Sequence, residues 1–273
     1  MAALAEIRRD LARLGGQADR EIDLFEAALT LAALALPERD RRPYRRRLNG
    51  MANLVASTAA TGLSAEEIRA ALDEVITRRF QLIGDDDDHD PSNLMTLLDS
   101  RRGSPLLLGL IWIAAGRRQG WMVEPLAFPR TLLVRLTDAA GRRIVVNPDG
   151  GWPLDAAGLC ALLKLTCGAE AELEPAYWLA LSNREVLLRL QNQVKQRHLR
   201  MNRLHHAAGA VEGTLLFAPS EVGLWRELGM IRLRLGDVPG AIHALESFVA
   251  RAPDSAVRHR ASTLLRSLMH RLT

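Results

Sequence analysis

Few residues of this 273-residue chain have side chains that could act together as a nucleophile and a base. Cys160 and Cys167 lie seven residues apart, and Ser104 stands where an apolar stretch begins. A thiolate or an activated hydroxyl at a helix start needs a nearby histidine to take its proton. No histidine occurs between Asp90 and Arg197. The sequence therefore predicts that the cysteines are small buried hydrophobes, with no disulfide and no catalytic pair.

The second group with possible chemistry is the acidic run from Asp85 to Asp90, which reads Asp-Asp-Asp-Asp-His-Asp. Clustered carboxylates attract hard cations, but four adjacent aspartates cannot all face one ion. An EF-hand loop would also need glycine at Asp90 and glutamate at Thr96. We therefore expect a solvated acidic loop and neither a metal nor a cofactor, with weak binding of a divalent ion or of an arginine-rich partner as the alternative.

Composition is that of a globular protein rich in helices. Hydrophobic residues make up 48% of the chain and charged residues 25%, whereas aromatic residues reach only 4%. The pI of about 9.6 reflects arginine, and the net charge of +4 supports nucleic-acid binding only weakly. No uncharged stretch is long enough to span a bilayer, and the N-terminus does not resemble a secretion signal. We expect a bacterial cytoplasmic protein that does not bind a membrane.

The elements before residue 100 are predicted helices. Apolar residues at helical spacing fill 22–36, which Pro37 ends, and a second apolar stripe begins at Leu48. The arginines at 45–47 precede this stripe and are expected on a solvated face, with anion or partner binding as the alternative. Ser64 and Glu67 form a capping box before a helix that we expect to reach Phe80.

Residues 101–151 are predicted to form the centre of the fold. Ser104 is the expected cap and Pro105 the first residue of a helix that reaches Gly116, apolar on nearly all sides and therefore buried. Residues 131–137 and 143–147 are predicted strands joined by a polar turn. A helix over 154–165 should follow.

From about Arg184 to the end, the sequence predicts helices with a period of 34 residues. Ala207 aligns with Ala241, and Pro219 aligns with Pro253. The second unit has the spacing of a tetratricopeptide repeat, carried by Trp225, Leu228, Gly229, Gly236, Ala241, Leu245 and Pro253. Small residues at Gly229 and Ala241 would let two antiparallel helices approach closely, and such repeats present a face for binding a peptide.

Four stretches of the chain resemble a bacterial family. They read DPSNLMTLLDSRRGSPLLLGLIW, GWMVEPLAFPRTLLVRL, VVNPDGG and EVLLRLQNQVKQRHL. In combination they are similar to the family of SirB-type proteins, in which tetratricopeptide repeats follow a transglutaminase-like domain and which is associated with the regulation of invasion genes. Transglutaminase-like sequences place a cysteine at a helix start, a histidine on a strand and an aspartate on the next strand. The family motif Phe-Pro-Gly-His aligns with Phe128–Thr131, and its Asp-Pro aligns with Asn147–Pro148.

This resemblance implies an α+β fold that is mainly helical. A transglutaminase-like, papain-like core with a small antiparallel sheet is expected over residues 1–180, and tetratricopeptide-type repeats over 181–273. It also implies that the cysteine, histidine and aspartate positions are Pro105, Thr131 and Asn147. None of these three side chains can perform the reaction, so we expect vestigial positions rather than catalytic residues.

The leading hypothesis is therefore a non-catalytic scaffold or adaptor that binds a protein or peptide through its repeats, with regulation as one role it could serve. Arg130, Arg232 and Arg234 are the candidate binding residues, and Arg135 is expected in a structural ion pair with Asp99 or Asp149. One alternative is a cryptic hydrolase or transferase with an unrecognised residue set. The other is a nucleic-acid-associated regulator, which the lack of aromatic residues between the arginines disfavours.

Overall fold

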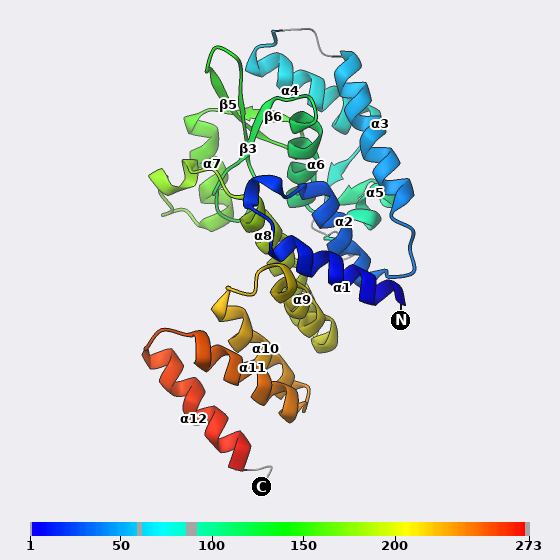
Figure 1. The fold of residues 1–273 in the computed structure, drawn as a ribbon. Coiled ribbons are helices and arrows are strands. Elements are labelled where there is room, and N and C mark those ends of the chain that lie inside the picture. Colours follow the sequence, from blue (N-terminus) through cyan, green and yellow to red (C-terminus); the bar gives the residue numbers. More distant parts are fainter. Residues whose placement is uncertain (1, 59–61, 86–91, 271–273) are drawn as a thin grey trace. The chain divides into compact units, whose positions relative to one another are not determined.

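The computed structural model describes residues 2–58, 62–85 and 92–270 (Figure 1). The acidic run predicted to be a solvated loop lies outside the described residues, except for Asp85. The chain divides into two compact units, one formed by residues 18–187 and the other by residues 1–17 and 188–273. We call them the core unit and the repeat unit. The domain boundary predicted at 180/181 stays a prediction.

The core unit contains a four-stranded antiparallel sheet in the order β3-β4-β5-β6 and a two-stranded parallel sheet of β1 and β2. The strands are β1 (Ile83–Gly84), β2 (Arg102–Gly103), β3 (Met122–Pro125), β4 (Val134–Thr137), β5 (Arg143–Asn147) and β6 (Trp152–Leu154). Its helical elements are η1 (Asp19–Glu21), α2 (Leu24–Ala35), α3 (Arg42–Thr58), α4 (Ala65–Asp73), η2 (Glu74–Arg79), α5 (Leu94–Ser100), α6 (Pro105–Arg117), α7 (Ala156–Cys167) and η3 (Pro175–Trp178).

Helix α6 forms the centre of the core unit, as its all-round apolar sequence predicts. Trp112 on this helix is 0% exposed, and every residue from 107 to 116 is buried. On one face of the sheet, Val123 contacts α6 so closely that a β-carbon at Gly116 would lie 2.6 Å from it. On the other face, Val145 packs with Leu159 and Leu163 of α7. The sheet is therefore covered on both sides.

Two predicted elements differ from those in the structure. The helix expected from Ser64 to Phe80 ends as α-helix at Asp73, and residues 74–79 continue it as a π-helical turn. The strand expected over 131–137 begins only at Val134, because Arg130 has a φ of 62° and turns the chain just before it. β3 and β6 were not predicted, since each is short and lacks a clear alternation.

The repeat unit consists of helices. They are α1 (Ala2–Gly15), the second part of α8 (Asn183–Arg200), α9 (Leu204–Phe217), α10 (Val222–Arg234), α11 (Val238–Arg251) and α12 (Ala256–His270). Helix α1 packs on α9, where a β-carbon at Gly15 would lie 2.9 Å from the Leu216 carbonyl oxygen. None of the helices in the described ranges is both long and apolar enough to cross a membrane.

Gly229 allows the close approach predicted for α10 and α11. A β-carbon at this position would lie 2.8 Å from the side chain of Leu245 and 3.5 Å from the carbonyl oxygen of Ala241. The equivalent position one period earlier is Lys195, which is only 5% exposed. A buried ammonium group needs a partner of opposite charge, and Lys195 forms an ion pair with Glu227 on α10, the first helix of the next repeat. The two repeats therefore fill the same position differently, one with a buried lysine in an ion pair and the other with a glycine in close helix contact.

Candidate functional site

The N-terminus of α6 is where the motif alignment predicts the nucleophile position of the transglutaminase-like pattern. Pro105 occupies the first helical position, and its side chain has no nucleophilic atom. Ser104 before it is 0% exposed, and its hydroxyl accepts a hydrogen bond from the Leu107 N–H at 3.4 Å. This bond makes Ser104 the helix cap. The Ser104 hydroxyl oxygen is therefore buried and already accepts a backbone hydrogen bond.

The turn before β4 contains Thr131, the residue predicted to stand at the histidine position. The Thr131 N–H donates to the Pro129 carbonyl at 2.8 Å, so Arg130 is the central residue of a three-residue turn. A positive φ at such a position is strained for a residue with a side chain. This geometry gives a physical reason for the glycine of the family motif, since glycine adopts a positive φ without that cost. Arg130 is exposed, and Thr131 is half-buried.

Asn147, predicted to stand at the aspartate position, is the last residue of β5. Its Oδ1 accepts the Asp149 N–H at 3.2 Å, which closes the turn toward β6. Asp149 in turn accepts the Gly84 N–H at 3.1 Å and so connects this turn with β1. The amide oxygen of Asn147 therefore stabilises its own turn.

The three positions lie on elements that contact one another. Gly109 is one helical turn after Pro105, and a β-carbon there would lie 2.9 Å from the side chain of Leu132, the neighbour of Thr131. Val134 of β4 pairs with Val146, the residue before Asn147. We call this region the triad corner. It brings together Pro105, Thr131 and Asn147, whereas Arg232 and Arg234 belong to the repeat unit.

The described part of the core unit supplies neither an imidazole nor a metal cluster to the triad corner. Residues 18–85 and 92–187 contain no histidine. Cys160 is half-buried and Cys167 exposed, both on α7. Among the described residues, no three His, Cys, Asp or Glu side chains are grouped as metal ligands.

Arg135 forms an ion pair, but its partner differs from the predicted ones. Its guanidinium lies 2.8 Å from the Glu124 carboxylate and donates to the Trp178 carbonyl. The register of β3 and β4 places Glu124 directly opposite Arg135. The prediction of Asp99 or Asp149 was therefore wrong. Asp99 instead accepts hydrogen bonds from Arg39, Tyr44 and Arg47.

Arg117 holds the end of α6 against the start of α8. Its guanidinium donates to Asn183 at 2.7 Å, and the Asp19 carboxylate accepts the N–H groups of Asn183 and Arg184. Burial lowers the pKa of Arg117, while the charges of Asp19 and Glu124 oppose that shift. Asp19 satisfies N–H groups that the first turn of a helix leaves unpaired. We assign this cluster a structural role, because Arg117, Asn183 and Asp19 use their polar groups in hydrogen bonds that connect α6, η1 and α8.

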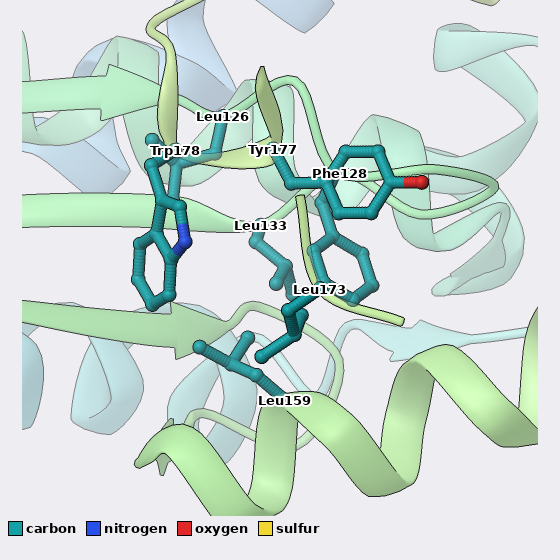
Figure 2. Close-up of a pocket in the computed structure, with 7 residues that line it drawn as sticks. All are labelled: Leu126, Phe128, Leu133, Leu159, Leu173, Tyr177 and Trp178. Carbon is teal, nitrogen blue, oxygen red and sulfur yellow. The ribbon is translucent and has the colours of Figure 1, made fainter. Parts of the chain in front are cut away.

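An apolar depression lies beside the triad corner, on the α7 side of the sheet (Figure 2). It surrounds about 180 Å³ of space, part of it open to solvent, and is lined by Leu126, Phe128, Leu133, Leu159, Leu173, Tyr177 and Trp178. Figure 2 shows the Tyr177 hydroxyl directed away from the leucines. Burial, then the charges of Glu174 and Cys167, raise the pKa of Tyr177. The lining of the depression contains no charged side chain.

The two candidate arginines of the repeat unit have different surroundings. Arg232 is 2.7 Å from the Glu212 carboxylate and donates to the Gly240 carbonyl, so it connects α9, α10 and the start of α11. Arg234 is exposed, and its guanidinium donates a 3.5 Å hydrogen bond to Asn202. Of the two, Arg234 is the one with a guanidinium available at the surface.

Comparison with known families agrees with this architecture. The model of the transglutaminase-like superfamily matches residues 42–192, and that of the tetratricopeptide repeat matches residues 194–266. The first match covers more than half of the chain, and the chain therefore belongs to the transglutaminase-like superfamily. The fold class predicted from the motifs, an α+β core followed by helical repeats, is confirmed.

The relatives include proteins named SirB1, as the motifs predicted, and proteins named UPF0162. A UPF0162 protein of Xylella fastidiosa (strain Temecula1) is 26% identical over 249 residues, which cover 87% of this chain and 86% of the relative. Protein SirB1 of Salmonella typhimurium is 27% identical over 177 residues, 64% of this chain and 65% of that protein. A crystal structure of menin aligns with 98% of this chain and 73% of the menin chain, at 10% sequence identity. The TM-score of this alignment is 0.40, too low to indicate a shared fold.

Proposed function

We propose that the chain is a non-catalytic protein-interaction scaffold or adaptor with a regulatory role. In this proposal the cysteine, histidine and aspartate positions of the transglutaminase-like fold are Pro105, Thr131 and Asn147. The observation that carries it is the start of α6, where Pro105 has no nucleophile and the Ser104 hydroxyl is a buried cap. Acyl transfer by this fold needs a nucleophile at that point and a base within reach.

The polar groups around the triad corner also support the proposal. The Asn147 oxygen accepts a backbone N–H, and the Arg135 guanidinium is paired with Glu124. The nearest thiols in sequence, Cys160 and Cys167, belong to α7, and the described part of the core unit has no histidine to activate them.

Binding would take place through the repeats, because tetratricopeptide repeats generally mediate protein–protein interaction. Arg234 is the exposed candidate for this contact, whereas Arg232 supports the repeat from within. Arg130 is an exposed candidate of the core unit, beside the triad corner. The proposed partner is a protein or peptide in the cytoplasm, with no cofactor involved.

The catalytic half of the proposal is tested by assaying the purified full chain for thiol-ester, amide and transamidation turnover. We expect no turnover above the level of the Ser104→Ala and Cys167→Ala variants. Turnover by the unaltered chain that either substitution abolishes would show a cryptic enzyme and overturn the proposal.

The binding half is tested by affinity capture from cells that naturally make the chain. Arg234→Glu reverses an exposed charge of the repeat unit, and Arg266→Glu on α12 reverses another as the matched control. A protein captured by the unaltered chain and by Arg266→Glu, but not by Arg234→Glu, would support the scaffold. Identical captures by all three chains would contradict binding at Arg234.

A further inference from the structure

Positive charge is concentrated in the repeat unit. Residues 1–17 and 188–273 hold 16 of the 36 Lys and Arg residues but only 8 of the 32 Asp and Glu residues, a net charge of +8. The core unit holds the other 20 basic and 24 acidic residues, a net charge of −4. The excess charge that sets the high pI therefore belongs entirely to the repeat unit.

Four exposed arginines of the repeat unit recur with its 34-residue period. Arg226 on α10 corresponds to Arg260 on α12, and Arg200 on α8 corresponds to Arg234 on α10. Residues four and eight apart on a helix share one face, so Arg226 and Arg234 lie on the same side of α10. All four are exposed, and we call them the arginine stripe.

The fold makes little use of these arginines, although Arg234 donates a 3.5 Å hydrogen bond to Asn202. Within residues 2–58, 62–85 and 92–270, none of the four has a carboxylate within ion-pair distance. Other arginines of the same unit are used. Arg232 pairs with Glu212, Arg258 with Asp254, and Arg251 lies over the Trp225 ring at 5.0 Å. The stripe therefore keeps its charge available to a partner.

Met230 adds an apolar contact to the stripe. It lies between Arg226 and Arg234 on the same face of α10 and is 47% exposed. The two arginines are eight residues apart, about 12 Å along the helix. An extended peptide covers that distance in about four residues. A segment with acidic residues at this spacing and an apolar residue between them would match both charge and hydrophobicity.

We propose that the arginine stripe binds an acidic segment of a partner protein, with Met230 contacting an apolar residue between the carboxylates. This inference rests on the proposed scaffold function and specifies the chemistry of its partner. Charge complementarity favours carboxylates or phosphates, and the aromatic residues argue against a single-stranded nucleic acid as the source of the phosphates. Phe217 and Phe248 are buried and Trp225 lies under Arg251, so the described repeat helices offer no freely exposed Phe, Tyr or Trp ring on which a base could stack.

The test uses the full chain and a fluorescein-labelled peptide of three Glu-Glu-Leu-Glu repeats, followed by fluorescence anisotropy. Peptides with glutamine or lysine in place of glutamate report charge dependence, and a 12-nucleotide single-stranded DNA reports nucleic-acid binding. We expect the glutamate peptide to bind, the other two peptides not to bind, and affinity to fall as salt increases.

Two double variants separate the stripe from overall charge. Arg226→Glu with Arg234→Glu should weaken binding of the glutamate peptide by on the order of tenfold or more. Arg8→Glu with Arg266→Glu changes the net charge equally at exposed positions outside the stripe and should leave affinity within about twofold. Circular dichroism should show both variants folded, because none of the four arginines takes part in an ion pair of the described structure.

Three outcomes would overturn the inference: no binding of the glutamate peptide, equal weakening in both double variants, or stronger stripe-dependent binding of the DNA. Its failure is distinguishable from failure of the scaffold function. A partner captured by the unaltered chain and still captured by the Arg226→Glu, Arg234→Glu variant would leave the scaffold in place and reject the acidic segment.

Discussion

The triad corner and the arginine stripe use their polar side chains in opposite ways. In the corner, the Ser104 hydroxyl and the Asn147 amide oxygen accept backbone N–H groups. On the stripe, Arg226 and Arg260 are exposed and, among the described residues, have no ion-pair partner. One region has its hydrogen bonds satisfied internally, and the other presents its charges to solvent.

This difference locates stability and binding in different parts of the chain. A buried polar group left without a partner is destabilising, so satisfying the corner internally stabilises the core unit. An exposed charge on a helix gains little from the fold itself. Substitutions in the corner should therefore change the free energy of unfolding and leave peptide binding intact, and substitutions in the stripe should do the reverse.

Trp112→Ala should give the largest change in stability. Trp112 is 0% exposed at the centre of α6, and removing a buried aromatic side chain costs about 3–5 kcal/mol. Urea unfolding followed by circular dichroism measures this loss. Binding of the glutamate peptide should persist under conditions in which the variant remains folded.

Trp112→Phe is the matched control. Its loss should be smaller, because phenylalanine keeps much of the ring and the indole N–H has no hydrogen-bond partner in the described structure. Equal losses for the two variants, or a loss below 1 kcal/mol for alanine, would contradict the central role of α6.

Gly229→Val should affect both properties, since Gly229 belongs to the stripe-bearing helix α10 and faces α11. The added β-carbon would lie 2.8 Å from Leu245, and overpacking of this kind costs about 1–3 kcal/mol. Because α10 must move away from α11, affinity for the glutamate peptide should fall as well. Unfolding in urea and anisotropy on the same preparation measure the two effects.

A control on the same helix is Gly223→Ala. Gly223 has no atom within 4 Å of its would-be β-carbon, and replacing a helical glycine with alanine stabilises by about 0.4–1 kcal/mol. Unaltered stability in Gly229→Val would show that the close approach of α10 and α11 is not required.

Helix starts and small-residue contacts were predictable from the sequence. Ser104 and Pro105 have the residue types of a cap and a first helical position, and the structure places them so. Gly229 and Ala241 likewise contact across two helices, as the repeat spacing predicts. These features depend on local chemistry or on a fixed period, and a single sequence contains both.

Long-range pairing was not predictable. Arg135 was assigned the wrong partner because β3 was not predicted, and only its register places Glu124 opposite Arg135. The packing of α1 on α9 joins residues about 200 positions apart, and no local pattern signals it. The burial of Lys195 was predictable but was not predicted. The repeat alignment places this lysine at the position that Gly229 occupies in the next unit, where two helices meet.

Ser104→Ala tests whether the corner is structural. Loss of a helix cap costs about 0.5–2 kcal/mol, and the Ser104 oxygen is the group that accepts the Leu107 N–H. We expect this loss in urea unfolding, with no turnover of acyl substrates before or after the substitution. Stability equal to that of the unaltered chain would show that the cap contributes nothing.

Arg130→Gly should have the smallest effect and the opposite sign. Arg130 has a φ of 62°, a conformation that costs a residue with a β-carbon about 1–2 kcal/mol. Glycine removes this strain but loses about 0.5–1 kcal/mol more chain entropy on folding, so a net gain of about 0.5–1 kcal/mol is expected in urea unfolding. Arg130→Ala keeps the strain and should show no gain. If glycine and alanine are equally stable, the turn is not strained. If only glycine stabilises, Arg130 is retained at the expense of stability, which is the pattern of a residue kept for binding.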